Sequence, residues 1–155
     1  MNPYVVIDIG GTSIKYGLAD AKGQLLETHE MPTEAQKGGP HILNTTKEIV
    51  ARYLKKHPLA GVAISSAGMV DPDKGEIFYA GPQIPNYAGT QFKKEIEETF
   101  QIPCEIENDV NCAGLAEVTT GHAKGSNNAV CLTIGTGIGG CLLLDGQGFH
   151  GFSNS

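Results

Sequence analysis

Apolar residues recur near the start of the chain with the spacing of β-strands. Residues 4–9 (YVVIDI) form a nearly continuous apolar run, and residues 13–19 carry apolar side chains at every second position. A period of two predicts strands, and Gly10-Gly11 between the two runs predicts a hairpin turn. A third strand is expected over residues 24–31, after a turn at 20–23. The chain therefore opens with a predicted antiparallel meander.

After the meander the pattern changes to alternating helices and strands. Spacings of three and four residues between apolar positions predict helices, and short apolar runs predict buried strands. The predicted helices cover 41–56, 90–100 and 109–120, the strands cover 59–65 and 103–107, and the loops cover 32–40 and 68–87. This order predicts an α/β fold in which a mixed sheet is flanked by helices.

A polar segment separates a second part of the chain. Residues 121–128 form a candidate linker between an N-terminal α/β lobe (1–120) and residues 129–155. Two further strands are expected at 129–134 and 141–145, on either side of a glycine-rich turn. We interpret residues 129–155 as the first strands of a second lobe.

The charge balance argues against several classes of partner. The chain carries 17 Asp and Glu against 11 Lys and Arg, a net charge of −6. Nucleic acids and anionic membranes attract clustered cationic groups, so neither is an expected partner. No apolar run reaches the roughly 20 residues of a membrane span, and the first residues lack the layout of a signal peptide. We expect a cytoplasmic protein with reduced cysteine thiols.

Glycine is enriched, with 21 of 155 residues, and concentrates in three clusters that follow apolar runs: DIGGT (8–12), ISSAGMVD (64–71) and TIGTGIGG (133–140). Glycine turns allow a ligand to approach the backbone closely, and their N–H groups bind phosphate without net positive charge. The phosphate-loop motif GxxxxGK[ST] is absent. Residues 135–140 match GxGxxG, but the strand-like CLLLD that follows favours a phosphate-binding hairpin over a dinucleotide site.

The first cluster has two interpretations. A carboxylate at the end of a buried strand needs a partner, water or a metal ion. Just beyond Asp8, the residues Gly10, Gly11, Thr12 and Lys15 can surround an anion. The functional interpretation is a metal-linked carboxylate beside a phosphate-binding hairpin. The structural alternative is a plain Gly-Gly hairpin in which Asp8 caps the turn.

Glu107, Asn108 and Asp109 lie where a short predicted strand meets a predicted helix. Ligands bind at the carboxyl ends of strands in α/β sheets, so Asp109 is a candidate general base for a substrate hydroxyl. The structural alternative is that Asn108 or Asp109 caps the helix. The five histidines lack the spacing of metal ligands and receive no role.

Together these motifs resemble the N-terminal half of a known family. DIGGTSIK, ISSAGMVD, ENDVNCAGLAE and LTIGTGIGG follow one another in the order and at the distances found in the ROK family (repressor, open reading frame, kinase). The resemblance implies the actin-like (ribonuclease H-like) ATPase fold, with two lobes around a cleft. Members of this family phosphorylate hexoses or related sugars with ATP and Mg²⁺, or act as sugar-responsive repressors.

The resemblance also implies roles for individual residues. It makes Asp109 the catalytic base and a sugar ligand, Asn108 the sugar-binding amide, and Gly68 a backbone position beside the sugar. It places Asp8 near Mg²⁺. The phosphates of ATP are expected at two motifs, the first formed by Asp8, Gly10, Gly11, Thr12 and Lys15 and the second by Gly135, Thr136, Gly137, Gly139 and Gly140.

The sequence also departs from the family pattern. Ala67 replaces a usual proline, Gln83 and Tyr87 replace a common asparagine and tryptophan, and Cys141 replaces a glycine. The chain stops before the family's GEIGH-like sugar-binding segment and before the zinc-binding cysteine cluster of many members. We therefore expect an N-terminal part that is catalytically poor by itself.

The leading hypothesis is an ATP-dependent kinase of a hexose, an N-acylated hexosamine or a glucoside, dimeric at full length. The alternatives are a sugar-responsive regulator and a non-catalytic actin-like scaffold. A regulator would carry a helix-turn-helix domain before the first strand, yet that strand starts at about residue 4. A scaffold has no need of Asp109. Both observations favour the kinase.

Overall fold

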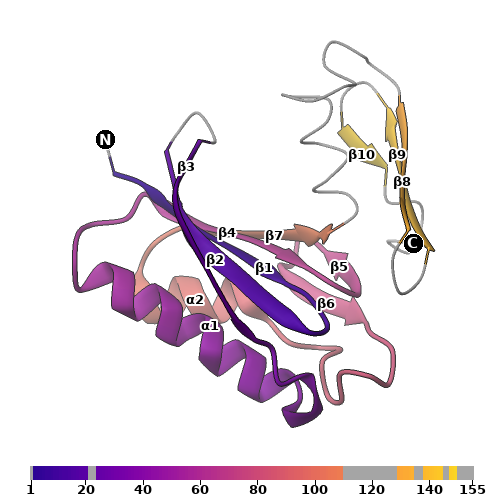
Figure 1. Ribbon diagram of the computed structural model, residues 1–155, viewed down its shortest axis with the longest axis horizontal. Coiled ribbons are helices and arrows are strands. Elements are labelled where there is room, and N and C mark those ends of the chain that lie inside the picture. The colour runs from indigo at the N-terminus through magenta and orange to yellow at the C-terminus, as the bar shows by residue number, and fades with distance from the viewer. Residues whose placement is uncertain (1, 21–23, 110–128, 135–137, 145–146, 150–155) are drawn as a thin grey trace. The chain divides into compact units, whose positions relative to one another are not determined.

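The computed structural model describes residues 2–20, 24–109, 129–134, 138–144 and 147–149. The chain divides into unit 1 (Met1–Glu107) and unit 2 (Asn108–Ser155), whose elements are labelled in Figure 1. The predicted linker at 121–128 lies outside the described residues, so the predicted domain limits stay a prediction.

Unit 1 is built on a five-stranded sheet in the order β3-β2-β1-β4-β7 (Figure 1). Its strands are β1 (Tyr4–Ile9), β2 (Ser13–Ala19), β3 (Leu25–Pro32), β4 (Gly61–Ser66) and β7 (Cys104–Asn108). The first three are antiparallel neighbours, which confirms the predicted meander. β4 runs parallel to β1 on its other side, so Ile9 pairs with Ile14 in β2 and with Ser66 in β4.

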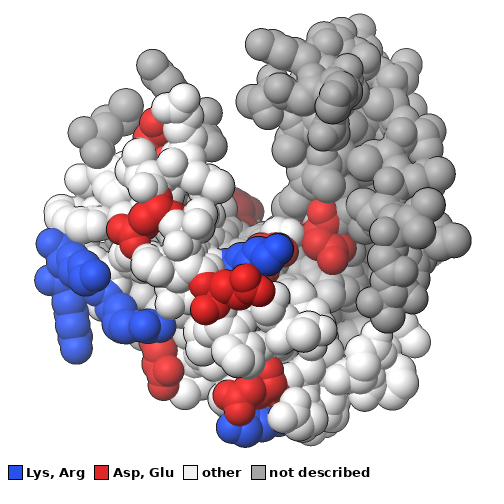
Figure 2. Space-filling model, viewed as in Figure 1, with Lys and Arg blue, Asp and Glu red and all other residues white. Residues whose placement is uncertain are grey.

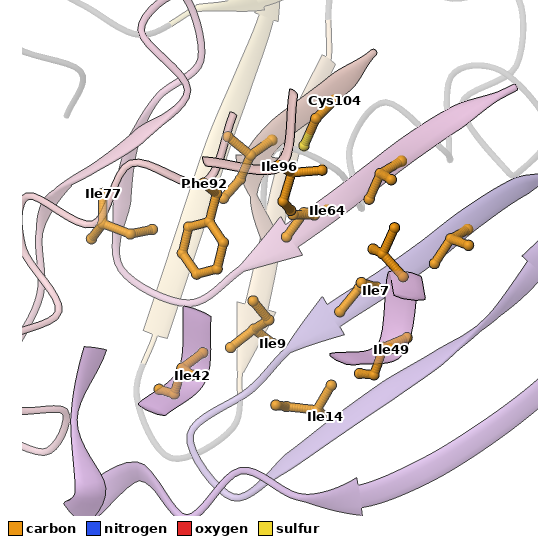
Figure 3. Close-up of a cluster of buried hydrophobic side chains, with 14 of the residues drawn as sticks. Ile7, Ile9, Ile14, Ile42, Ile49, Ile64, Ile77, Phe92, Ile96 and Cys104 are labelled. Carbon is orange, nitrogen blue, oxygen red and sulfur yellow. The ribbon is translucent and has the colours of Figure 1, made fainter. Parts of the chain in front are cut away.

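Two helices, α1 (Gly39–Leu54) and α2 (Phe92–Phe100), cover the same face of this sheet (Figure 1). Their inward side chains and alternate residues of β1, β2, β4 and β7 form one buried cluster. Figure 3 draws this cluster, which includes Ile7, Ile9, Ile14, Ile42, Ile49, Ile64, Phe92 and Ile96. Each such side chain contributes about 1.5–3 kcal/mol by leaving water. This burial sets which face of each strand points inward.

The segment 68–87, predicted as a loop, contains a β-hairpin. Its strands are β5 (Met69–Asp71) and β6 (Glu76–Tyr79), which pair antiparallel. Val70 and Ile77 are buried in the core, and the Asp71 carboxylate accepts two backbone N–H bonds across the turn. Strands of three and four residues are too short for a period of two to stand out. The loop prediction was therefore wrong here.

The segment 32–40, also predicted as a loop, holds a short 3-10 helix, η1 (Ala35–Lys37), and the first turn of α1. α1 begins at Gly39, two residues before the predicted start at 41. Pro40 suits the first turn of a helix because that turn has no intrahelical partner for its N–H groups.

Side chains of α2 hold the first residue of the edge strand β7. Lys93 Nζ donates to the Cys104 carbonyl at 2.8 Å, and the Glu97 carboxylate accepts the Cys104 N–H at 3.0 Å. Lys93 also pairs with Glu97 at 3.1 Å and with Glu105 at 2.9 Å. The hydrogen bond to Glu105 is the main cause of the raised pKa of Lys93. We call this set the Lys93–Glu97 clamp, and it occupies backbone groups that another strand could otherwise pair with.

Cys104 is a buried free thiol. Burial raises its pKa to about 12, so the thiol stays protonated at neutral pH and unreactive. The predicted core position is confirmed for this residue, and its redox state stays a prediction. Cys112 lies outside the described residues.

Unit 2 contains a three-stranded antiparallel sheet of β8 (Ala129–Ile134), β9 (Ile138–Leu144) and β10 (Gln147–Phe149). The predicted strand at 129–134 and the predicted hairpin are confirmed. β9 begins at Ile138 and not at 141, because Gly139 and Gly140 continue the pairing with β8. Glycine has no side chain and does not contribute to a pattern of apolar positions. The predicted strand was therefore too short.

The described surface of unit 1 mixes the two signs of charge. On the face drawn in Figure 2, the blue Lys and Arg side chains gather mainly at one margin, and the others lie against red Asp and Glu side chains. One such pair joins the two helices, with Lys47 Nζ 2.8 Å from a carboxylate oxygen of Glu95. Within the residues that the structure describes, no helix has the length and apolar character needed to cross a bilayer.

Replacing Lys93 by methionine tests the Lys93–Glu97 clamp. Lys93→Met keeps the apolar stem but removes the charged donor of the buried Cys104 carbonyl, so the free energy of unfolding should fall by about 1–3 kcal/mol. Lys94→Met is the matched control, because Lys94 is an exposed neighbour on α2, and its effect should stay within about 0.5 kcal/mol. Urea denaturation measures both values. Equal effects of the two substitutions would contradict the clamp.

Candidate functional site

The turn between β1 and β2 carries the first predicted phosphate motif. The Gly10 N–H donates to the Ser13 carbonyl at 3.0 Å and closes the turn. A Cβ atom on Gly10 would lie 3.0 Å from that same carbonyl, whereas a Cβ atom on Gly11 would meet nothing within 4 Å. The fold therefore explains the glycine at position 10. It gives no packing reason for glycine at position 11, which is exposed together with Thr12.

Asp8 and Lys15 flank this turn on neighbouring strands. They are register partners in β1 and β2, and both side chains are exposed. Asp8 sits on a strand whose Ile7 and Ile9 are buried, but it belongs to the opposite face of the sheet. A carboxylate at the end of a buried strand needs a partner, water or a metal ion. The exposure of Asp8 provides water. Within the described residues, no three His, Cys, Asp or Glu side chains gather as a metal site.

Gly68 lies just beyond the end of β4, in the turn before β5. Its φ of +89° is in the region that favours glycine, and a Cβ atom there would lie 2.9 Å from the Tyr79 carbonyl. Because Ile9 and Ser66 are register partners in parallel strands, β1 and β4 end side by side. The Gly10–Thr12 turn and the Gly68 turn therefore leave the same edge of the sheet.

A buried hydrogen bond fastens a long loop to this edge. The hydroxyl oxygens of Ser66 and Tyr87 are 2.5 Å apart, and both residues are buried. The Tyr87 ring also packs edge-on against Phe92, with 6.0 Å between the ring centroids. The sequence marked Tyr87 only as a departure from a tryptophan, and no pattern indicated Ser66 as its partner. The pair anchors the segment 81–90 next to the Gly68 turn.

Asn108 and Asp109 follow Glu107, the last residue of unit 1. β7 extends from Cys104 to Asn108, and Asp109 is in helical conformation. Both side chains are half-buried. The predicted junction of strand and helix is confirmed at its first residue, while residues 110–120 lie outside the described residues.

The second glycine motif is described only in part. Gly139 and Gly140 are members of β9, paired with Thr133 and Leu132. Gly135, Thr136 and Gly137 lie outside the described residues. The hairpin that contains the motif is present, and its role in phosphate binding stays a prediction.

Comparisons with known proteins converge on one family. The ROK family model matches residues 4–154. A Clostridium perfringens protein is 54% identical over 155 residues, which is 100% of this chain and 52% of that protein. The beta-glucoside kinase of Klebsiella pneumoniae is 37% identical over 145 residues, which is 93% of this chain and 47% of the kinase.

A solved structure gives the same picture. The ROK family glucokinase from Streptomyces griseus, in complex with glucose and AMPPNP, has a TM-score of 0.84 and 29% identity over 98% of this chain and 47% of that chain. This similarity confirms the predicted actin-like α/β fold. The chain spans about half the length of these relatives.

Proposed function

The chain belongs to the ROK family, and we propose that it forms the N-terminal part of an ATP-dependent sugar kinase. The observation that carries the proposal is the shared sheet edge, where an open glycine turn and the Gly68 turn lie side by side at the ends of β1 and β4. One turn suits phosphate and the other suits a close contact between sugar and backbone. The names of relatives, a beta-glucoside kinase and a glucokinase bound to glucose and AMPPNP, support both ligands.

The Gly10–Thr12 turn is the proposed site for phosphates of ATP. Backbone N–H groups at a tight turn bind anions, and the open space at Gly11 lets a phosphate approach the main chain. Lys15 is the exposed cation on the adjacent strand. The second glycine motif, Gly135–Gly140, is proposed to contribute further phosphate contacts.

Asp8 is the residue proposed to hold Mg²⁺. Magnesium usually keeps several waters and binds through one or two carboxylates together with substrate phosphates. A single exposed carboxylate beside a phosphate turn fits this donor set, and no cluster of three ligands is needed. The ion, when bound, supplies charge neutralisation for the phosphate oxygens.

The sugar is proposed to bind to Asn108, Asp109 and the backbone at Gly68. Asp109 accepts the proton of the attacking hydroxyl as that oxygen forms its bond to the γ-phosphorus. The bond from this phosphorus to the bridging oxygen breaks, and ADP leaves with the electron pair. The chain's own contribution is thus to orient the two reactants and to receive one proton.

Asp109→Asn in the complete kinase tests the base. The amide keeps the shape of the carboxylate but loses its basicity, so kcat should fall by about 100- to 10,000-fold while the Kd of the sugar changes little. Asp73→Asn is the matched control, because Asp73 is an exposed carboxylate in the β5–β6 turn. Coupled-enzyme detection of ADP gives kcat for both variants. A near-normal kcat for Asp109→Asn would refute the assignment.

Gly11→Val separates phosphate binding from turn geometry. The Cβ atom of the new side chain meets no protein atom within 4 Å, and position 11 is exposed, so the free energy of unfolding should change by less than about 0.5 kcal/mol. The same side chain blocks close approach to the main chain, so the Kd of AMPPNP should rise more than about tenfold. Calorimetric titration of AMPPNP and of the sugar measures both affinities. Lost sugar binding with intact AMPPNP binding would assign this turn to the sugar.

A further inference from the structure

A residue at the end of β3 fastens the β1–β2 turn. Thr33 directly follows β3, whose last residue, Pro32, pairs with Ser13 at the start of β2. The Thr33 N–H donates to the Thr12 carbonyl at 2.9 Å. Its hydroxyl Oγ1 donates to the Gly10 carbonyl at 2.7 Å. One residue therefore holds a carbonyl on each side of Gly11.

Thr33 is fully buried, with 0% of its surface exposed. A buried hydroxyl without a partner is costly, so the bond to Gly10 fixes the rotamer of Thr33 as well as the position of the carbonyl. Because Thr33 is buried, water cannot replace its hydroxyl as the donor to the Gly10 carbonyl unless the threonine becomes exposed. The contact is thus a fixed attachment of the turn to the protein interior.

The direction of the Gly10 carbonyl also sets the direction of the next amide. The Gly10 carbonyl and the Gly11 N–H belong to one planar trans peptide, in which the two groups point in opposite directions. With the carbonyl held toward the buried Thr33, the Gly11 N–H points away from it. Gly11 is exposed, and the space at its Cα is open.

We propose that Thr33 is a positioning residue for nucleotide binding, whose hydroxyl orients the Gly11 amide toward a phosphate oxygen of ATP. This inference rests on the proposed function of the turn. It adds the contact that fixes the direction of the Gly11 N–H donor. Preorganised backbone donors gain their effect from being oriented before the ligand arrives. Sequence patterns alone gave Thr33 no role, since it lies in a segment predicted as a loop.

Thr33→Val in the complete kinase is the test. Valine keeps the shape and removes the donor, so the Kd of AMPPNP with Mg²⁺ should rise about tenfold while the Kd of the sugar stays within about twofold. Hydrogen exchange of the Gly10 amide, which closes the turn, should speed up at least about fivefold in the absence of nucleotide. Thr33→Ser, which retains the hydroxyl, should restore most of both properties.

Thr46→Val is the matched control. Thr46 is equally buried, and its hydroxyl donates to the Ile42 carbonyl inside α1 at 2.9 Å, so the chemical change is the same at a distance from the turn. It should leave the Kd of AMPPNP unchanged. Equal rises in Kd for Thr33→Val and Thr46→Val, or an unchanged Kd for Thr33→Val, would overturn the inference. If the unsubstituted kinase binds no AMPPNP, the proposed function itself fails, whatever the exchange rates of the variants.

Discussion

The burial of one sheet face against α1 and α2 is the constraint on which the rest of unit 1 depends. Alternate residues of β1, β2, β4 and β7 enter the same apolar cluster as the inward side chains of both helices (Figure 3). A slip of one residue in any of these strands would turn its apolar side chains to the opposite face. The register of β1 against β2 and β4 is therefore fixed, and with it the level at which each strand ends.

That register produces the candidate site. β1 and β4 end level with each other, and the chain must leave both strands through tight turns at one edge. Neighbouring contacts hold these turns: Thr33 bonds the β1–β2 turn, and the Ser66–Tyr87 pair anchors the loop beside Gly68. All three of these side chains are buried. The exposed groups proposed to bind ligands are thus held by buried polar contacts, as a preorganised site requires.

The long elements were predictable because their periodicity extends over many residues. β1, β2, α1 and α2 lie close to their predicted positions, and the Gly10-Gly11 hairpin follows from local sequence alone. The β5–β6 hairpin was missed because its strands are only three and four residues long. The start of β9 was missed because Gly139 and Gly140 pair through their backbones, which no apolar pattern records.

The sequence indicated the exposed residues of the candidate site but not the residues that support them. Glycine clusters after apolar runs indicated the turns. The surroundings of Gly10 then gave a packing reason for glycine, whereas those of Gly11 gave none. Thr33 and Ser66 bond to residues far away in sequence, at separations of 23 and 21 positions. Such pairs depend on the tertiary register, so local sequence could not identify them.

Glycine-selective ¹⁵N labelling of the full-length protein, followed by titration with AMPPNP and Mg²⁺, tests the proposed phosphate role of the β1–β2 turn most directly. The amide resonances of Gly10 and Gly11 should shift with a single Kd, the Gly11 resonance most strongly. Gly75, in the β5–β6 turn, and Gly89, at the end of the following loop, should keep their positions. Saturable AMPPNP binding that leaves the Gly10 and Gly11 resonances unmoved would contradict the assignment of this turn to the nucleotide.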